Sequence, residues 1–312
     1  MGFSRAVISY AAFATLLSAV PTAGAPANDF QTCAQASGDA AIAACTRAIA
    51  SGRYRGSDLA QLYTNRGVEC RAKGDYDRAI ADFTEAIKLD PKQVNAYNNR
   101  GNAWGDEGDL DKAIADYNEA IKLDPKNAYA YNNRGVAWRD KGDLNRAIAD
   151  YTEAIRLDAK YATAYSNRGR ANLYSGSLPK ALADLNQASE LDPENAYTAL
   201  WLAIVNKRSN LSSRLPQAIA QLDMTKWPAP IIRLFVGQMT PEAVLAAAND
   251  PDAKKKQRQV CDANFYSGEL ILMQGAKEKA ANLFRLVAAD CPKDFTEWWA
   301  ANAELKALGL TP

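Results

Sequence analysis

The sequence predicts an all-α fold, a solenoid of helix-turn-helix pairs. The tripeptide Asn-Arg-Gly occurs four times at a constant interval, at positions 65–67, 99–101, 133–135 and 167–169. Between the copies, apolar residues recur at helical spacing in two short stretches that a glycine-containing turn separates. A period of about 20–50 residues indicates stacked repeats. Because one such helical pair cannot bury its apolar face alone, the pairs must stack on one another.

The segment 1–27 is typical of a secretory signal peptide. Arg5 is its only charged residue, and the apolar run that follows at positions 6–20 is short for a membrane span. Ala25 and Ala27 then provide the small residues of a cleavage site. The alternative is an N-terminal anchor. Cys33 lacks the small-residue box of a lipoprotein, so we expect an exported, periplasmic chain with no membrane anchor after cleavage.

The composition removes several functional classes. The 312 residues carry 37 basic and 36 acidic side chains, which gives no electrostatic reason to expect nucleic acid as a partner. There is no histidine, so Ser-His and Cys-His nucleophile pairs and the HExxH zinc motif are excluded. The five cysteines form no CxxC pair. We therefore predict a protein that is not an enzyme and needs no cofactor or metal.

Export makes disulfides the expected state of most cysteines. Cys33 and Cys45 flank a short helix-turn-helix, and Cys261 and Cys291 lie near the two ends of another helical pair. We predict these two bonds, each stabilising by about 2–4 kcal/mol. Cys70 remains, at a helix position that holds Trp in the next two repeats, and we interpret it as a small buried side chain. The alternative is a redox-active or intermolecular thiol.

The four repeats share more than the tripeptide. Two alanines follow each tripeptide glycine at fixed spacings, and most repeats end in Leu-Asp-Pro. The tripeptide glycine falls inside a helix, where we expect close approach of the partner helix to compensate for its cost. A second glycine, suited to the positive φ that ends a helix, occupies positions Gly74, Gly108, Gly142 and Gly176.

This pattern resembles the tetratricopeptide repeat (TPR). Four full copies cover residues 60–93, 94–127, 128–161 and 162–195. The resemblance implies a right-handed superhelix, whose inner groove is lined by the first helix of each repeat and binds peptides or proteins. The segment 28–59 precedes the repeats, and its helix GDAAIAACTRAIASG resembles the second helix of a repeat, so we expect a shortened N-terminal cap.

Residues 196–312 predict a degenerate continuation of the solenoid. Helices are expected at 196–208, 215–222 and 297–308, with further helix starts at Ile231 and Thr240. At Cys261 the repeat template returns, so we expect Cys261 to begin the first helix of a pair and Cys291 to end the second.

A second resemblance covers residues 227–309. The stretches WPAPIIRLFVGQMTPEAVL and NFYSGELILMQGAKEKAANLFRLVAADCPKDFTEWWAANAELKALG are similar to the C-terminal region of NlpI-type envelope proteins. These are adaptors that bring substrates to a C-terminal-processing protease and scaffold peptidoglycan hydrolases, so the resemblance implies such a partner here. NlpI-type proteins are lipidated and this chain lacks a lipobox, so membrane tethering is not implied.

The candidate binding residues lie on the first helices of the repeats. Asn is expected to face the groove in all four, where its amide can bond an extended peptide backbone through both donor and acceptor. The alternative is that Asn belongs only to the common sequence of the repeat. A clamp for a peptide carboxylate is rejected, because the second, fifth and sixth helix positions carry no basic residue. The predicted groove comprises Asn65, Asn98, Asn99, Asn102, Tyr129, Asn132, Asn133, Ser166, Asn167, Arg170 and Tyr174.

Other charged and aromatic side chains have structural interpretations. Each tripeptide arginine is followed, at one constant spacing, by an aspartate on the facing helix, which predicts buried Arg–Asp pairs. Trp104 and Trp138 are expected in the core. Arg71, Arg139 and Arg170 either favour an acidic ligand or are solvated groove charges. The pairs are Arg66 with Asp82, Arg100 with Asp116, Arg134 with Asp150 and Arg168 with Asp184.

The sequence thus predicts a non-enzymatic scaffold that presents peptides or proteins to an envelope protease or cell-wall hydrolase. The alternative is a structural factor that self-assembles, for example as a homodimer, through its C-terminal helices. An exposed apolar face with Trp298 and Trp299 on the last helix would favour that alternative.

Overall fold

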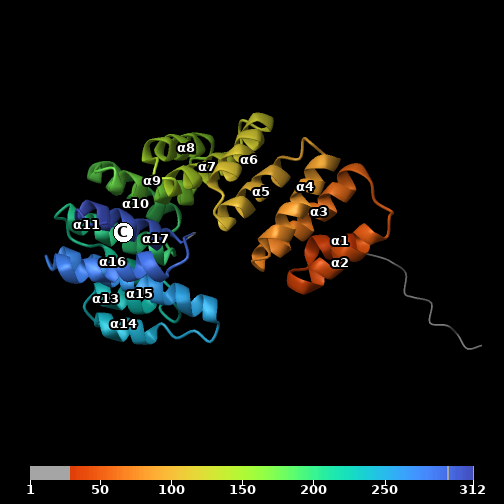
Figure 1. The fold of residues 1–312 in the computed structure, drawn as a ribbon. Helices are drawn as coiled ribbons and strands as arrows, with labels where there is room; N and C mark the ends of the chain where they lie inside the picture. Colours follow the sequence, from red (N-terminus) through yellow and green to blue (C-terminus); the bar gives the residue numbers. More distant parts are fainter. Residues whose placement is uncertain (1–28, 294, 312) are drawn as a thin grey trace, which may run out of the picture.

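The computed structural model describes residues 29–293 and 295–311, and the expected signal peptide lies outside the described residues. This part of the chain is all-α, with seventeen α-helices, one 3₁₀ helix and no strand (Figure 1). Within the described ranges, no helix combines the length and apolar character that a bilayer span requires. The predicted fold class is confirmed.

Each repeat folds as the predicted pair of antiparallel helices. Gly74, Gly108, Gly142 and Gly176 have φ between 81° and 96° and turn the chain after each first helix. Aspartates then cap most second helices; the Asp143 side chain, for example, accepts a hydrogen bond from the Arg146 backbone N–H at 3.0 Å. The helices are α3 (Gly56–Ala72), α4 (Tyr76–Leu89), α5 (Val94–Glu107), α6 (Leu110–Leu123), α7 (Ala128–Asp140), α8 (Leu144–Leu157), α9 (Ala162–Tyr174) and α10 (Leu178–Leu191).

The glycine inside each first helix is required by close packing. A Cβ on Gly135 would lie 2.7 Å from Cε1 of Tyr151 and 3.2 Å from the backbone oxygen of Ala147. The ring of the second helix therefore rests on the backbone of the first, which is the compensation expected from the sequence. The same contact occurs with Phe83, Tyr117 and Leu185 in the other repeats.

We expect Gly135→Ala to destabilise the protein by about 1–3 kcal/mol, since the added methyl group must displace Tyr151. Gly105 provides a matched control, because it is also helical but has open space where its Cβ would lie. Gly105→Ala should instead stabilise by about 0.5–1 kcal/mol through helix propensity. Urea unfolding followed by circular dichroism measures both, and two shifts of the same sign would contradict the packing argument.

The N-terminal cap precedes the repeats as α1 (Asp29–Gln35) and α2 (Gly38–Ala50). The Cys33–Cys45 disulfide joins these helices, and the second predicted bond, Cys261–Cys291, is present as well. Cys70 is a free thiol inside the core, as predicted, and burial raises its pKa. A thiol in that state is a poor nucleophile, which argues against a redox role.

The C-terminal third continues the solenoid with less regular pairs. One expectation is wrong: α15 begins at Ala253, so Cys261 lies well inside that helix instead of at its start, while Cys291 directly follows α16 as expected. The Lys254–Lys256 run occupies the added, exposed turns of α15. The helices are α11 (Ala196–Arg208), α12 (Leu215–Ala218), the 3₁₀ helix η1 (Ile219–Gln221), α13 (Ala229–Phe235), α14 (Pro241–Ala247), α15 (Ala253–Met273), α16 (Lys277–Asp290) and α17 (Thr296–Ala307).

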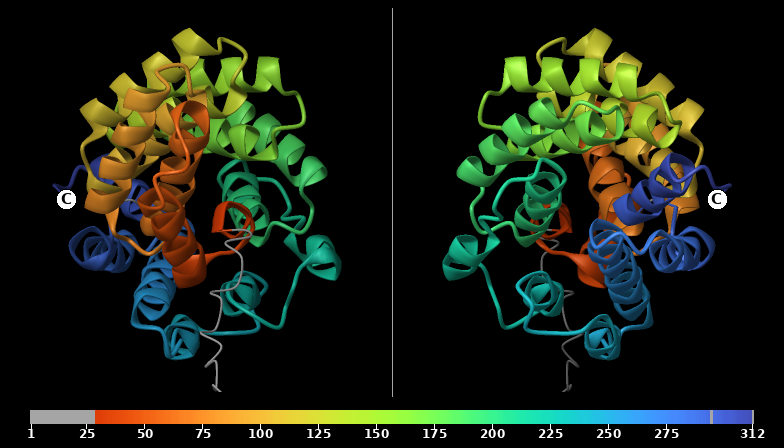
Figure 2. Two further views of the ribbon diagram at one scale, coloured as in Figure 1. Left: turned by 90° about the vertical axis from the view of Figure 1, so that its right-hand side faces the viewer. Right: turned by 90° about the vertical axis from the view of Figure 1, so that its left-hand side faces the viewer.

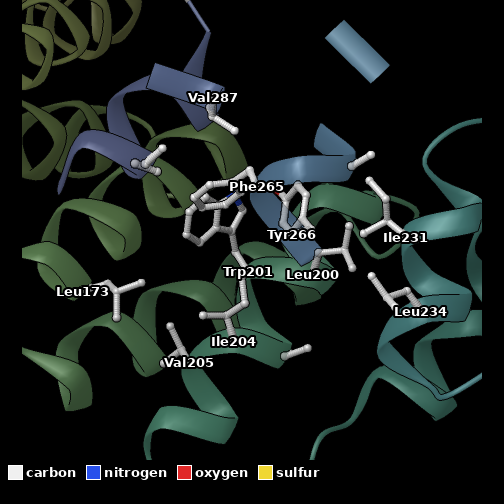
Figure 3. Close-up of a cluster of buried hydrophobic side chains, with 14 of the residues drawn as sticks. Leu173, Leu200, Trp201, Ile204, Val205, Ile231, Leu234, Phe265, Tyr266 and Val287 are labelled. Carbon is white, nitrogen blue, oxygen red and sulfur yellow. The ribbon is translucent and has the colours of Figure 1, made fainter. Parts of the chain in front are cut away.

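The largest core lies where the fourth repeat meets this third. Trp201 of α11 packs on Phe265 and Tyr266 of α15, with ring centroids 5.4 Å and 6.1 Å away (Figure 3). Leu173 of α9 belongs to the same buried cluster. The C-terminal helices therefore share one core with the last repeat, whereas the earlier repeats have small separate clusters between neighbouring helices.

The superhelix turns far enough to bring distant segments together. Viewed along its axis, the chain runs around a ring from α1 to α17 (Figure 2). The ammonium group of Lys254 lies 3.3 Å from the place that a Cβ on Gly74 would occupy, so the start of α15 touches the turn of the first repeat.

Candidate functional site

The repeated Arg–Asp pairs are structural, as predicted. Arg134 donates through Nε and Nη2 to the two oxygens of Asp150 at 2.8 Å and 2.7 Å, a bidentate pair between α7 and α8. Its Nη1 also donates to Oδ1 of Asn118, 2.7 Å away on the preceding repeat. Each arginine thus joins two helices of its own repeat and one of the repeat before. The equivalent bonds occur at Arg66–Asp82, Arg100–Asp116 and Arg168–Asp184.

Several of the predicted groove residues are buried between helices. Asn167 Nδ2 donates to Asn132 Oδ1 at 2.9 Å, and both side chains are shielded from solvent. Asn98 and Ser166 are buried as well. Asn98, Asn132 and Asn167 therefore do not face a peptide in this structure, because their side chains are buried between helices, whereas Ser166, although mostly buried, also lines a cavity between the fourth repeat and the C-terminal helices.

A second set of groove residues stays open to solvent. Asn102 and Asn133 line a cavity of about 210 Å³ on α5 and α7, together with Arg71 of α3. Asn133 Nδ2 and Tyr117 Oη both donate to Asn102 Oδ1, at 3.0 Å and 2.8 Å. Arg71 Nε donates to Asp106 Oδ2 at 2.6 Å. We call this place, defined by Arg71, Asn102, Asp106 and Asn133, the groove patch.

Arg71 and Arg139 were expected either to favour an acidic ligand or to be solvated groove charges, but each is paired with an aspartate of the protein. Arg71 is held by Asp106. Arg139 is buried, paired with Asp140 at 2.7 Å and placed 5.4 Å over the ring of Trp299, so it is not a solvated groove charge. The contacts of Trp299 with Arg139 and with Tyr174 place α17 against the C-terminal ends of α7 and α9.

The two groove tyrosines have different surroundings. Tyr129 is 64% exposed, beside Tyr161, and its role as a ligand contact stays a prediction. Tyr174 is not a groove contact here, because its ring packs edge-on against Trp201 and Trp299 and its hydroxyl is shielded from solvent. Two predicted groove residues remain. Asn65 Oδ1 accepts a hydrogen bond from Gln61 Nε2 at 2.7 Å, and Asn99 is partly exposed.

The tryptophans predicted for the core lie at its edge. Trp104 and Trp138 are partly buried, each under a cation: Lys112 Nζ lies 4.1 Å from the ring centroid of Trp104, and the guanidinium carbon of Arg146 lies 4.1 Å from that of Trp138. They pack between successive repeats.

A cavity of about 630 Å³ lies between the fourth repeat and the C-terminal helices. We call it the junction cavity. Thr163 and Arg170 of α9 form one wall, Tyr197 and Trp201 of α11 a second, and the other sides come from α15, α17 and the segments before them. Arg170 and Ser166, two of the predicted groove residues, line this cavity, whereas sequence reasoning did not single out the opposite walls, among them Trp227, Arg258, Asp262, Phe295 and Glu297.

Two buried acids form the floor of the junction cavity. Asp262 Oδ2 accepts from the Tyr197 hydroxyl and from Trp227 Nε1, both at 2.7 Å, while its Oδ1 has no partner in the described part of the chain. Glu297 accepts from the Tyr266 hydroxyl at 3.1 Å. Burial raises the pKa of both carboxyl groups, so each resists ionisation in the empty cavity.

The last helix does not present the apolar face that self-assembly would need. Trp299 is buried against Tyr174 and Arg139, and Trp298 is partly buried with its Nε1 donating to the Ala288 carbonyl at 3.0 Å. The exposed tryptophan pair that would have favoured self-assembly is therefore not present, because α17 packs on the fourth repeat and on α16.

One Ser-x-x-Lys spacing, Ser177 to Lys180, occurs at the start of α10. A lysine base must be desolvated or placed beside another cation to lose its proton. Lys180 is exposed on an outer helix, and neither residue lines the groove patch or the junction cavity. This spacing therefore lacks the setting of a nucleophile and its base.

Comparison with known proteins identifies the repeats. The family model described as TPR repeat matches residues 67–105, 106–138 and 137–176. A tetratricopeptide repeat protein from Parabacteroides merdae is similar in structure, with a TM-score of 0.53 and 18% identity over 86% of this chain and 90% of that one. Pseudomonas aeruginosa pilF gives 0.50 and 16% over 78% and 97%. The TPR domain of Arabidopsis OM64 is 31% identical over 37% of this chain and 95% of that one, with a TM-score of 0.36.

The chain therefore contains tetratricopeptide repeats, and its fold is a TPR solenoid. Folds of this class generally serve as protein-interaction scaffolds, because the stacked repeats create an extended concave surface. The resemblance of residues 227–309 to NlpI-type proteins stays a prediction.

Proposed function

We propose that this chain is an exported, periplasmic scaffold that binds a peptide or protein and presents it to an envelope protease or cell-wall hydrolase. The groove patch carries the proposal. Asn102 Oδ1 already accepts from Asn133 and Tyr117, and Asn133 Oδ1 accepts from Asn132. The amide N–H groups of Asn102 and the second lone pair of Asn133 Oδ1 are what the patch offers to an extended backbone. The Arg71–Asp106 pair beside them supplies both signs of charge to polar side chains of a partner.

Affinity capture from envelope extract with the mature protein tests this function. The variant Asn102→Ala/Asn133→Ala removes two amides from the patch, and each hydrogen bond contributes about 0.5–1.5 kcal/mol, so we expect capture weakened by about five- to 150-fold. The control Asn145→Ala removes an exposed amide from α8, on the outer face. Capture of the same protease or hydrolase by both variants would place the binding site elsewhere, and recovery of this chain alone would refute the adaptor proposal.

Export has a separate test in the thiols. Both disulfides join buried cysteines, so protein from the periplasmic fraction should contain one modifiable thiol, Cys70, and only after unfolding. Alkylation in denaturant followed by mass spectrometry counts the thiols. Protein produced in the cytosol with the segment 1–27 deleted is the control and should show all five cysteines as thiols. The same result in the exported sample, or absence of the chain from that fraction, would contradict export.

A further inference from the structure

Arg170 is a largely buried cation without an ion-pair partner among the described residues. Its Nη2 donates to the amide oxygen of Asn167, its guanidinium lies 5.8 Å from the ring centroid of Trp201, and its Nε is shielded from solvent without an acceptor. Buried charges in proteins are ordinarily paired. In the described ranges, the ion pairs include the arginines around it, Arg139, Arg168 and Arg208, but not Arg170.

The acids of the junction cavity do not supply the missing partner. Glu297 is close enough to attract Arg170 electrostatically, but its hydrogen bond comes from the Tyr266 hydroxyl. Asp262 likewise accepts from neutral donors. A carboxyl group can shed its charge by taking a proton, whereas a guanidinium cannot. At the wall formed by Arg170, the guanidinium charge is therefore balanced by no ion pair among the described residues, and its Nε has no acceptor.

Three aromatic side chains contribute to the other walls, next to several charged and polar residues. Trp227, Tyr197 and Phe295 are partly exposed and line the same space as Arg170. A volume of about 630 Å³ accommodates one or two amino-acid residues or a small organic molecule. Arg258 stands over the Phe295 ring at 5.6 Å on another side of the cavity.

We propose that the junction cavity binds a carboxylate carried on an apolar or aromatic body, with Arg170 receiving the carboxylate and Trp227, Tyr197 and Phe295 receiving the body. This site is separate from the groove patch and does not depend on it. The same chemistry occurs in the C-terminal residue of a peptide and in a small organic acid.

Calorimetry on the mature protein tests the proposal with four probes: N-acetyl-phenylalanine, N-acetyl-Ala-Ala-Phe as the free acid, the same tripeptide as its C-terminal amide, and phenylethylamine. We expect both acids to bind and the amide to bind at least about tenfold more weakly, the usual cost of losing a charge-assisted bond. A tripeptide acid at least tenfold tighter than N-acetyl-phenylalanine identifies a peptide end as the ligand. Equal affinities identify a small organic acid.

Three variants locate the site. Arg170→Gln should weaken both acids at least tenfold and leave the amide unchanged. Thr163→Trp fills the cavity mouth from an exposed position without altering any charge, and should abolish binding of all probes. Arg156→Gln removes an exposed arginine from α8 and should bind as the wild type does. Circular dichroism verifies the fold of each, and Thr163→Trp still decides the location if Arg170→Gln does not fold.

Any of three results would overturn the proposal. The tripeptide acid and its amide could bind with equal affinity, Arg170→Gln could leave the affinity of the acids unchanged, or neither acid could give heat at millimolar concentration. Tighter binding of phenylethylamine than of the acids would assign the cavity to a cation held by Asp262 and Glu297 instead.

Discussion

Replacing Asp150 by Ala is expected to lower the free energy of unfolding by about 3–5 kcal/mol, the largest single effect among the repeat positions. The substitution leaves the guanidinium of Arg134, which is mostly buried, without either oxygen of its bidentate partner. A buried, uncompensated cation costs far more than the pair itself contributes. Chemical denaturation at neutral pH measures the loss.

The control for this prediction lies on the same helix. Glu153 pairs with Arg156 at 2.6 Å, but the arginine side chain is 65% exposed. Exposed pairs at this spacing contribute about 0.3–0.5 kcal/mol, so Glu153→Ala should be nearly neutral. The double variant Arg134→Met/Asp150→Leu should recover most of the lost stability, because no charge of the pair remains buried. Equal losses from Asp150→Ala and Glu153→Ala would show that the Arg–Asp pairs are ordinary surface contacts.

The Arg–Asp pairs were predictable because both partners recur in one repeat. Between Arg134 and Asp150 the chain completes one helix, turns, and runs through half of the next helix, so the pairing follows from the hairpin alone. The glycines inside the helices were predictable for the same reason, since each packs on a side chain of its own repeat. Contacts within one repeat recur four times at a constant spacing, so they can be predicted from the sequence.

The groove was only partly predictable because it depends on contacts between repeats. Repeat position alone does not distinguish Asn132, which is bonded to Asn167 of the next repeat, from Asn133, which lines the groove patch. Tyr174 occupies a groove position in sequence, yet Trp299 from α17 covers it. The repeat pattern does not indicate that α17 packs against α9.

The junction cavity illustrates the same limit. Arg170 was identified from its place in the repeat, while Asp262 and Glu297 lie in the irregular third, where no template assigns a direction to a side chain. Their burial follows from the shared core of α9, α11 and α15, which is a property of the assembled solenoid. The spacing of Cys261 and Cys291 predicted that α15 and α16 form a hairpin, but it does not indicate which helices pack against that hairpin.

A buried triad in the C-terminal third should make the stability depend on pH. Arg208 of α11 donates through Nη2 to Glu269 of α15 at 2.6 Å and to Glu304 of α17 at 2.7 Å. Burial, with the neighbouring Glu304 carboxylate, raises the pKa of Glu269 to about 8 from its usual value of 4.5. The folded state thus holds this proton more tightly than the unfolded chain. Its contribution to stability is complete below about pH 4.5 and is lost as pH rises to about 8.

Glu269→Gln isolates that contribution, because glutamine mimics the protonated acid and does not titrate. We expect the variant to gain on the wild type as pH rises from 5 to 8, by up to about 1.4 kcal/mol per pH unit. Denaturation at several pH values measures the difference, and Glu153→Gln, an exposed acid, should show a far smaller one.

Arg208→Met tests the triad from the other side, because it removes the cation that joins the two acids. At pH 8 we expect a loss of about 3–5 kcal/mol, since one carboxylate then remains buried without a partner. At pH 5 the loss should be much smaller, because Glu269, whose pKa burial raises to about 8, is then protonated. The three residues come from three helices, so the triad ties α17 to α11 and α15. A loss that is equal at the two pH values would mean that Arg208 stabilises by packing alone and that the charge of Glu269 plays no part.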